Sequence, residues 1–316
     1  MNDSSEIKIS DSWIMSFRGG KNIVDPERPY SWIVEKELSP SGSVEDVLTI
    51  FLTNRECPFH CLMCDLWKNT TDFTLSDGLI SGQIEWVLNQ APAVKHIKLY
   101  NSGSFFDTGA IPLNEYERIA GLLKGFDTVI VESHPAFIGK KSLEFRDRIK
   151  TDLQVAIGLE CVNINVLENL NKRMTLDDFT GSVSFLLDND IFTRAFILLR
   201  PPFIMSERDG IFWAERSIDF AFDAGVECCV IIPVRGGNGI MEKLAEKGLF
   251  SPPGIKSLEK VLEYGIEKQA GRVFADIWDL KLFSKCDKCH AARTDRITGM
   301  NLTQRLLPDV KCTCDD

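Results

Sequence analysis

Residues 47–64 read VLTIFLTNRECPFHCLMC, an apolar run that passes directly into a loop with three cysteines. The apolar part, 47–53, has the length and composition of a fully buried parallel strand. The loop spaces its thiols as Cys57-x3-Cys61-x2-Cys64, a rare pattern in a chain with ten cysteines among 316 residues. A strand that ends in such a cluster indicates a metal site at the carboxyl end of a parallel sheet.

Further apolar runs follow, and helical periodicity separates each run from the next. The predicted strands are 96–100, 128–132, 153–159, 192–199, 228–234 and 273–278. The predicted helices are 77–90, 113–124, 164–171, 176–188, 207–224 and a pair within 239–270 that is interrupted at Pro252–Pro253. This alternation predicts an α/β fold with parallel strands and right-handed crossovers, which is either a barrel or a doubly wound sheet.

The composition and charge of the chain argue against several classes of protein. The chain is 44% hydrophobic and carries a net charge of −10, which argues against tight nucleic-acid binding by bulk charge but not against a local basic patch. Its apolar stretches are too short for a transmembrane helix, and its first 30 residues lack the pattern of a secretory signal. We therefore expect a cytoplasmic protein with no membrane contact, in which clustered thiols bind metal more often than they form disulfides.

Three thiolates on one short loop are suited to a particular kind of metal centre. They hold three irons of a cubane cluster and leave the fourth iron without a protein ligand. An open coordination position is what a metal centre needs in order to bind a cofactor or substrate. The alternatives are three incidental thiols or a zinc site, although structural zinc usually takes four protein ligands.

The cysteine spacing and the strand–helix order resemble the radical S-adenosylmethionine (SAM) superfamily. The strings KLYNSGSFFD (98–107), VIVESHPAFI (129–138), VAIGLE (155–160), LNKRMTLDDF (170–179) and LLRPPF (198–203) resemble its archaeosine synthase branch, and more distantly the Elongator catalytic subunit. The resemblance implies a partial (βα)6 TIM-like barrel with a [4Fe–4S] cluster and SAM as cofactors. It also implies reductive cleavage of SAM to a 5′-deoxyadenosyl radical that abstracts hydrogen from a substrate. Met63 departs from the aromatic residue that is usual before the third cysteine.

The same resemblance implies positions that bind SAM. The turn Ser102, Gly103 and Ser104 lies where the superfamily binds the SAM amino group, although locally it also fits an ordinary strand-to-helix turn. Glu160 looks like the acid that binds the SAM ribose. In the turn Asn171, Lys172 and Arg173, one of the bases is expected to reach the SAM carboxylate, with Arg173 as the candidate and a solvated basic turn as the alternative. The strand-end residues Glu132 and Pro233 complete the expected cofactor-binding set, and the catalytic residues are unknown.

Three further polar residues follow predicted strands. His134 stands near Glu132, where an imidazole and a carboxylate together hold a cation or move a proton, although a lone histidine is more often structural. Arg200 and Arg235 are candidates for anchoring a negatively charged group of the substrate.

The end of the chain carries a second cysteine group, Cys286-x2-Cys289 with Cys312-x-Cys314. Four thiolates suit a zinc site or an auxiliary iron–sulfur cluster, and unrelated thiols are the alternative. Six bases and two acids lie within 281–305, which predicts either a phosphate-binding patch or a solvated face. The remaining cysteines, Cys161, Cys228 and Cys229, are expected in the core.

We expect three parts: an irregular lead-in at 1–45 with a possible strand near 32–34, a core barrel at 46–280 and a Cys-rich metal-binding extension at 281–316. The leading hypothesis is a radical SAM enzyme that acts on a tRNA base. The alternatives are a radical SAM enzyme for a small metabolite, favoured by a pI of about 5.1 and the lack of a recognisable RNA-binding module, and a non-catalytic iron–sulfur or zinc scaffold. A reductant protein of the flavodoxin or ferredoxin type is the expected partner.

Overall fold

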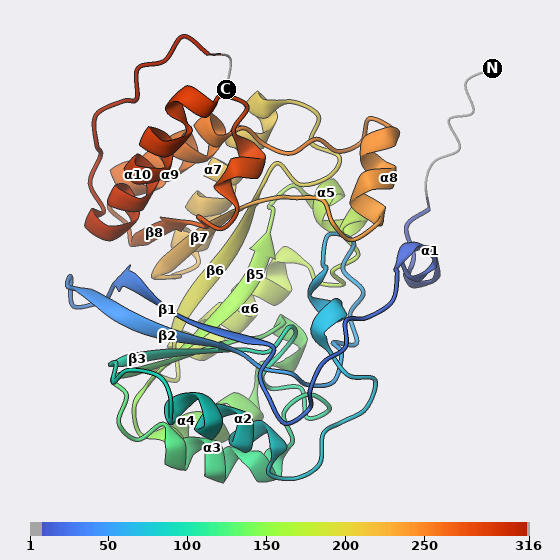
Figure 1. The fold of residues 1–316 in the computed structure, drawn as a ribbon, viewed down its shortest axis with the longest axis vertical. Helices are drawn as coiled ribbons and strands as arrows, with labels where there is room; N and C mark the ends of the chain where they lie inside the picture. The colour runs from blue at the N-terminus through green and yellow to red at the C-terminus, as the bar shows by residue number, and fades with distance from the viewer. Residues whose placement is uncertain (1–7, 315–316) are drawn as a thin grey trace.

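The computed structural model describes residues 8–314, in which eight strands form one sheet in chain order (Figure 1). The strands are β1 (Ser31–Leu38), β2 (Val44–Phe51), β3 (His96–Tyr100), β4 (Thr128–Glu132), β5 (Asp152–Glu160), β6 (Phe192–Leu199), β7 (Cys228–Pro233) and β8 (Arg272–Ala275). β1 pairs antiparallel with β2, and each later pair is parallel. Strands that follow in chain order lack the switch point of a doubly wound sheet, so the partial barrel is confirmed.

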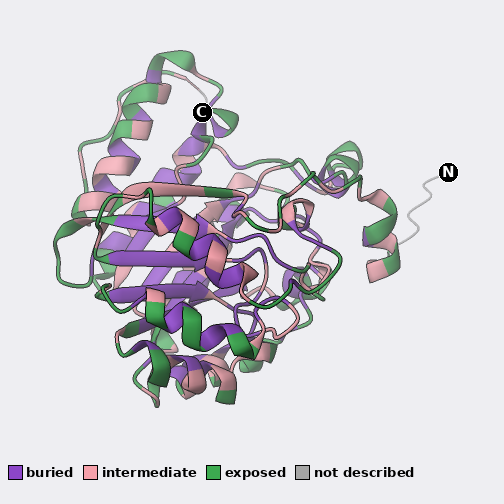
Figure 2. Ribbon diagram, turned by 60° about the horizontal axis from the view of Figure 1, so that its bottom comes forward, coloured by how far each residue is buried: buried purple, intermediate pink, exposed green. Residues whose placement is uncertain are grey.

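Helices surround this curved sheet, and most of them pack on its outer face (Figure 1). They are α1 (Asp11–Phe17), α2 (Leu79–Leu88), α3 (Tyr116–Leu122), α4 (Lys140–Ile149), α5 (Ile164–Asn169), α6 (Leu176–Leu187), α7 (Glu207–Asp223), α8 (Ile240–Glu246), α9 (Ile255–Lys268) and α10 (Asp287–Thr303), with short 3-10 turns at η1 (Leu66–Asn69), η2 (Leu113–Glu115), η3 (Pro135–Phe137) and η4 (Leu280–Phe283). The strands are largely buried, whereas the helices expose their outer faces (Figure 2). Among the described residues, no helix combines the length and apolarity needed to cross a bilayer.

The lead-in was expected to be irregular apart from one possible strand near 32–34; β1 confirms that strand, and α1 is a helix that was not expected. Ser10 caps α1 by accepting a hydrogen bond from the Trp13 amide at 3.2 Å, and β1 joins the sheet as an edge strand. Because β2 begins at Val44, the expected boundary after residue 45 falls inside a strand. Residues 1–7 of the lead-in and 315–316 of the extension lie outside the described residues.

The first helix belongs to a second apolar core. Ile14 of α1 is buried in one cluster with Leu62 of the cysteine loop, Val166 of α5 and Met241 of α8. Figure 1 shows α1, α5 and α8 on the same side of the sheet, away from α9 and α10. The lead-in therefore packs over the cysteine loop.

The barrel stays open between β1 and β8, and polar contacts bridge this gap. The Arg272 guanidinium donates to the Leu38 carbonyl at 2.9 Å, and the Trp278 indole donates to Glu35 at 2.9 Å. Helix α10 contacts both edge strands. The edges are thus covered, which removes two exposed templates for strand pairing between molecules.

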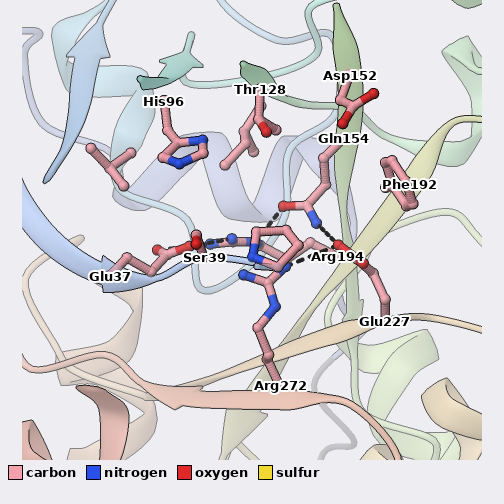
Figure 3. A pocket seen from close by; sticks show the side chains of 13 residues that line it. Glu37, Ser39, His96, Thr128, Asp152, Gln154, Phe192, Arg194, Glu227 and Arg272 are labelled. Atoms are coloured by element: carbon pink, nitrogen blue, oxygen red, sulfur yellow. Dashed lines mark hydrogen bonds and ion pairs between the residues drawn. The ribbon is translucent and has the colours of Figure 1, made fainter. Parts of the chain in front are cut away.

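Charged and polar side chains line a pocket at the end of the barrel where the parallel strands begin (Figure 3). Glu37 accepts hydrogen bonds from Arg194 at 2.6 Å and from Lys98 at 2.5 Å. Arg194 also donates to Gln154 at 2.9 Å, and Gln154 donates in turn to Glu227. Burial alone would raise the pKa of Glu37, but Arg194 and Lys98 hold it well below its usual range. This network links β1, β3, β5 and β6 at the barrel end opposite the cysteine loop.

Candidate active site

The three loop cysteines lie just beyond the carboxyl end of β2, as the sequence predicts. All three are free thiols, and burial raises the pKa of each to about 12. A thiolate is therefore unfavourable in this loop unless a positive centre compensates its charge, which is what a bound metal provides.

How closely the sulfurs of a cysteine group approach one another indicates which kind of metal centre the group can hold. In the described part of the chain, the thiols whose sulfurs all lie within 4.8 Å of one another are the four C-terminal ones, not Cys57, Cys61 and Cys64. A single zinc ion gathers its ligands closely, whereas a cubane cluster spreads them over several irons. Of the residues that the structure describes, the thiols gathered closely enough for one ion are the C-terminal four.

Several segments hold the cysteine loop in place. Asn171 donates to the His60 carbonyl at 2.8 Å, and the Leu62 amide donates to the Leu170 carbonyl at 2.9 Å. The buried Asn238 donates to the Leu62 carbonyl at 2.8 Å while its own oxygen caps α8. The loop is thus fixed by the turn before α6 and by the turn before α8.

The 102–104 turn contacts the first cysteine. A Cβ at Gly103 would lie 3.2 Å from the Cys57 Cβ, so only glycine allows this approach without a shift. Glu132 holds the turn by accepting hydrogen bonds from the Asn101 amide at 2.7 Å and the Gly103 amide at 3.4 Å. Burial raises the pKa of Glu132 to about 7, against the effect of these hydrogen bonds. In this structure Glu132 positions the expected SAM-binding turn.

Ser102 and Ser104 differ in their contacts. Ser102 has a left-handed backbone, with φ of 53°, and its hydroxyl donates to the Tyr30 hydroxyl at 3.3 Å. Ser104 accepts a hydrogen bond from the His134 amide at 2.9 Å. Ser104 therefore fastens the turn to the end of β4.

Glu160 lies at a bulge where the β5–β6 register shifts, and its φ is 63°. Its carboxylate pairs with the Lys172 ammonium, and both side chains are buried. Burial alone would lower the pKa of Lys172, but Glu160 and the nearby Cys61 raise it. Gly158 makes the pair possible because a Cβ there would overlap both charged groups.

Lys172, not Arg173, is the base whose charge acts on the Cys57 and Cys61 thiols, where it opposes the effect of burial on their pKa. Arg173 pairs with Asp11 of α1 and lines a polar pocket together with His134 and Asp178. Its expected contact with the SAM carboxylate stays a prediction. Pro233 ends β7 in a buried position opposite Leu199 of β6.

His134 is not available as a proton shuttle or a cation ligand in this structure. Its Nδ1 accepts from the Ala136 amide at 3.1 Å, which leaves Nε2 to donate to the Lys172 carbonyl at 2.8 Å. Its ring stacks on Phe59 of the cysteine loop with centroids 3.9 Å apart. Burial lowers the pKa of His134 to about 4, so the ring is neutral and structural.

The two arginines expected to anchor a substrate are both engaged elsewhere. Arg200 donates to Glu207 at 2.6 Å, to the Pro252 carbonyl at 3.0 Å and to the Met205 carbonyl at 2.9 Å. Arg235 pairs with Asp276 at 2.7 Å and with Asp279 at 3.1 Å. These contacts tie loops to the barrel, so the expectation of free anchoring cations is not supported.

The basic segment 281–305 is also less positive than its sequence indicates. Arg293 and Arg296 are buried, and they pair with Glu259 and Glu263 of α9. Two of the six bases therefore hold α10 against α9 and do not form a phosphate-binding face. Cys161, Cys228 and Cys229 are buried, as expected for core residues.

The sequence did not reveal several residues that build the site. These are Asp11 and Arg18 beside the cysteine loop, Tyr30 beside Ser102, and Asn238; Lys172 was a candidate base, but its pairing with Glu160 was not foreseen. An Asn-Gly pair directly before a predicted helix was the available signal for Asn238, since asparagine is a preferred helix cap. Arg18 pairs with Glu56 at 2.6 Å, and nothing in the local sequence marks that contact.

Comparison with solved structures identifies the architecture. Elp3 of Methanocaldococcus infernus matches with a TM-score of 0.51 at 13% identity, over 70% of this chain and 58% of that chain. SuiB of Streptococcus suis, solved with SAM bound, matches with a TM-score of 0.50 at 11% identity, over 71% and 48%. The fold is the partial barrel of the radical SAM enzymes. Identities this low establish the fold alone.

The sequence is also similar to three curated proteins. The chain is 24% identical to an uncharacterized protein of Methanocaldococcus jannaschii, over 93% of this chain and 87% of that protein. It is 29% identical to archaeosine synthase subunit beta of Thermococcus kodakarensis, over 54% and 55%, and 26% identical to that of Methanosarcina acetivorans, over 70% and 67%. The match to the Thermococcus subunit thus spans about half of that protein's length. No protein-family model matches the chain.

Proposed function

We propose that this chain is a radical SAM enzyme that modifies a base in tRNA. The observation that carries the proposal is the contact between the Cys57 loop and the Gly103 turn at the mouth of a radical SAM-type barrel. The similarity to archaeosine synthase subunit beta supports tRNA as the substrate.

In this proposal Cys57, Cys61 and Cys64 hold a [4Fe–4S] cluster. When bound, the cluster and SAM supply a 5′-deoxyadenosyl radical. The Gly103 turn binds the amino group of SAM, and Glu132 keeps that turn in position through two backbone amides.

Glu160 binds the ribose hydroxyls, because a carboxylate accepts two hydrogen bonds. Lys172 orients that carboxylate and compensates its charge inside the barrel mouth. Arg173 binds the SAM carboxylate after leaving Asp11, and Pro233 lines the cofactor site from β7. A flavodoxin- or ferredoxin-type protein delivers the electron in the cytoplasm.

Incubation of the anaerobically reconstituted protein with dithionite, SAM and unmodified tRNA tests the substrate. We expect release of 5′-deoxyadenosine to rise when tRNA is present, and a mass change in one nucleoside after digestion. The Cys57→Ala variant is the control and is expected to give neither. Phosphate contacts are strongest at low salt, so a mobility-shift assay that shows no tRNA binding there would rule out tRNA as the substrate.

A small metabolite is the second candidate for the substrate. The buried ion pairs of Arg293 and Arg296 favour it, since they leave the basic segment with fewer cations for phosphates. The same incubation with a small-molecule cell extract in place of tRNA distinguishes the two. A protein that binds iron yet cleaves no SAM under either condition would be a scaffold.

A further inference from the structure

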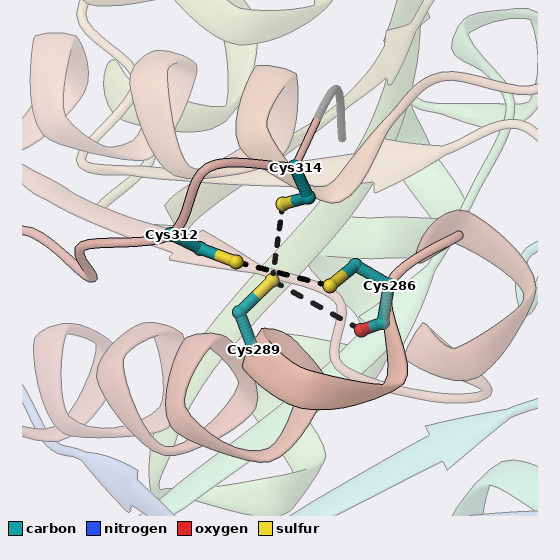
Figure 4. A group of neighbouring side chains, drawn as sticks. All are labelled: Cys286, Cys289, Cys312 and Cys314. Carbon is teal, nitrogen blue, oxygen red and sulfur yellow. Dashed lines mark hydrogen bonds between the residues drawn. The ribbon is translucent and has the colours of Figure 1, made fainter.

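Four thiols from two segments meet at the C-terminal end of the chain (Figure 4). Cys286 is the N-cap residue of α10, and Cys289 lies in the first turn of that helix. Cys312 and Cys314 come from the strap 304–314 that follows the helix. The four sulfurs all lie within 4.8 Å of one another.

The distances between these sulfurs fit one metal ion. A tetrahedral ion with Zn–S bonds of about 2.3 Å places its sulfurs about 3.8 Å apart. The Cys286 and Cys312 sulfurs are 3.8 Å apart, and the Cys289 and Cys314 sulfurs are 3.5 Å apart. Sulfurs bound to different irons of a cluster are separated further, so four sulfurs this close leave no room for one.

The surroundings compensate the charge of four thiolates. Arg293 hydrogen-bonds the Cys289 thiol, and Lys256 donates to the Cys314 carbonyl at 2.8 Å. The positive end of the α10 dipole also faces Cys286 and Cys289. A four-thiolate site with one divalent ion carries a net charge of −2, and these groups offset part of it, since Arg293 also pairs with Glu259.

The strap is held along its length by the same helix. Arg296 donates to the Pro308 carbonyl at 2.9 Å and pairs with Glu263 of α9. Arg293 pairs with Glu259, also on α9. The thiols therefore lie at the end of a strap that α10 already positions, which preorganises the site.

We propose that Cys286, Cys289, Cys312 and Cys314 bind a single structural zinc ion that fastens residues 304–314 to α10. Thiolate sulfur in a closed tetrahedral set is the coordination that zinc takes in structural sites. The site has no open position and takes no part in the chemistry of SAM. This proposal does not depend on the proposed function.

Elemental analysis of a variant without the loop thiols tests it directly. The full chain with Cys57→Ala, Cys61→Ala and Cys64→Ala is expected to retain one zinc per chain and no iron. Adding Cys286→Ser and Cys312→Ser is expected to abolish the zinc, whereas adding Cys161→Ala, a buried thiol outside both groups, is expected to leave it. Iron with acid-labile sulfide, a single iron in place of zinc, or no metal in the first variant would each overturn the proposal.

The unmodified protein provides a second measurement if those variants fail to fold. One equivalent of Co²⁺, added after chelation of the zinc, is expected to give the thiolate charge-transfer and visible ligand-field bands of a tetrahedral four-sulfur site. Weak visible bands of the kind that octahedral Co²⁺ gives would contradict the assignment. Neither readout uses SAM cleavage, so failure here and failure of the radical chemistry are distinguishable.

Discussion

Two glycines set how closely the loops of the candidate site approach one another. Gly103 brings its turn against Cys57, and Gly158 leaves the space in which Glu160 meets Lys172. Left-handed backbone at Ser102, Glu160 and Arg173 accompanies these close approaches. Strained backbone of this kind persists where surrounding structure determines it, and it gathers at functional sites.

Replacing Gly158 with alanine tests whether the space beside Glu160 and Lys172 matters for stability. The added Cβ would displace the Glu160–Lys172 pair, and breaking a buried pair costs about 3–5 kcal/mol. Gly181→Ala in α6 is the matched control, because a Cβ there meets nothing within 4 Å. We expect urea denaturation to show a loss only for Gly158→Ala, and equal stability of the two variants would contradict this account.

His134 gives a prediction on pH dependence. Its pKa is about 4 in the folded protein, below the ordinary 6.5, so the unfolded chain binds a proton more readily as pH falls. The stabilising contribution of His134 is therefore full above pH 6.5 and declines toward pH 4. Compared with His134→Gln, the wild type is expected to lose its stability advantage over that window, as measured by urea midpoints. An advantage that grows on acidification would show that the ring is charged in the fold.

At the scale of elements, α1 covers the cysteine loop. Ile14 is fully buried beside Leu62, whereas its neighbour Met15 is 46% exposed. Because both lie on one short helix, they provide a paired comparison in which only one side chain contacts the loop core.

Ile14→Ala is expected to destabilise the protein by about 2–5 kcal/mol, the usual range for such a truncation in a core. It is also expected to speed the loss of iron to a chelator, because the loop loses its cover. Met15→Ala is expected to change neither quantity measurably. Iron loss at the same rate in both variants would show that the packing of α1 does not protect the cysteine loop.

The sequence predicts the central elements well because buried parallel strands have continuous apolar runs. The segments 96–100, 128–132 and 192–199 match β3, β4 and β6 at both ends. Helices α4 and α10 escaped prediction because their sequences carry a weak apolar stripe, and α1 escaped it because the helix has only 7 residues. For α4, KKSLEFRDRI buries only a few side chains, and α10 buries arginines where an apolar face is expected.

The candidate site is predictable only in part, for a related reason. Cysteine spacing marks the loop, and the Gly-Leu-Glu string marks Glu160. What those residues contact is set by tertiary packing, so neither the Lys172 partner of Glu160 nor the internal pairing of Arg200 and Arg293 follows from local sequence.

At the scale of the whole molecule, the barrel has two chemically different ends. The carboxyl ends of the strands carry the cysteine loop, and the opposite end is filled by the Glu37–Arg194 network. In barrels of this kind the first end serves chemistry and the second serves stability. The network is therefore expected to affect folding and not SAM cleavage.

Arg194→Met tests that division of roles. Removing one partner leaves Glu37 buried without its main counter-ion, at a cost of about 3–5 kcal/mol. Lys36 lies on the same strand as Glu37 and forms an exposed pair with Asp46 of β2. Lys36→Met removes that pair and is expected to cost less than about 1 kcal/mol. A comparable loss in the two variants would argue against a structural role for the network.

Reductive cleavage of SAM by the anaerobically reconstituted protein is the most direct test of the radical SAM assignment. The wild type and Cys161→Ala are expected to show a reduced [4Fe–4S] electron paramagnetic resonance signal that changes when SAM is added, and to release 5′-deoxyadenosine. The variant with Cys57→Ala, Cys61→Ala and Cys64→Ala is expected to show neither. A wild type whose reduced cluster does not respond to SAM, or a triple variant that still releases 5′-deoxyadenosine, would contradict the assignment.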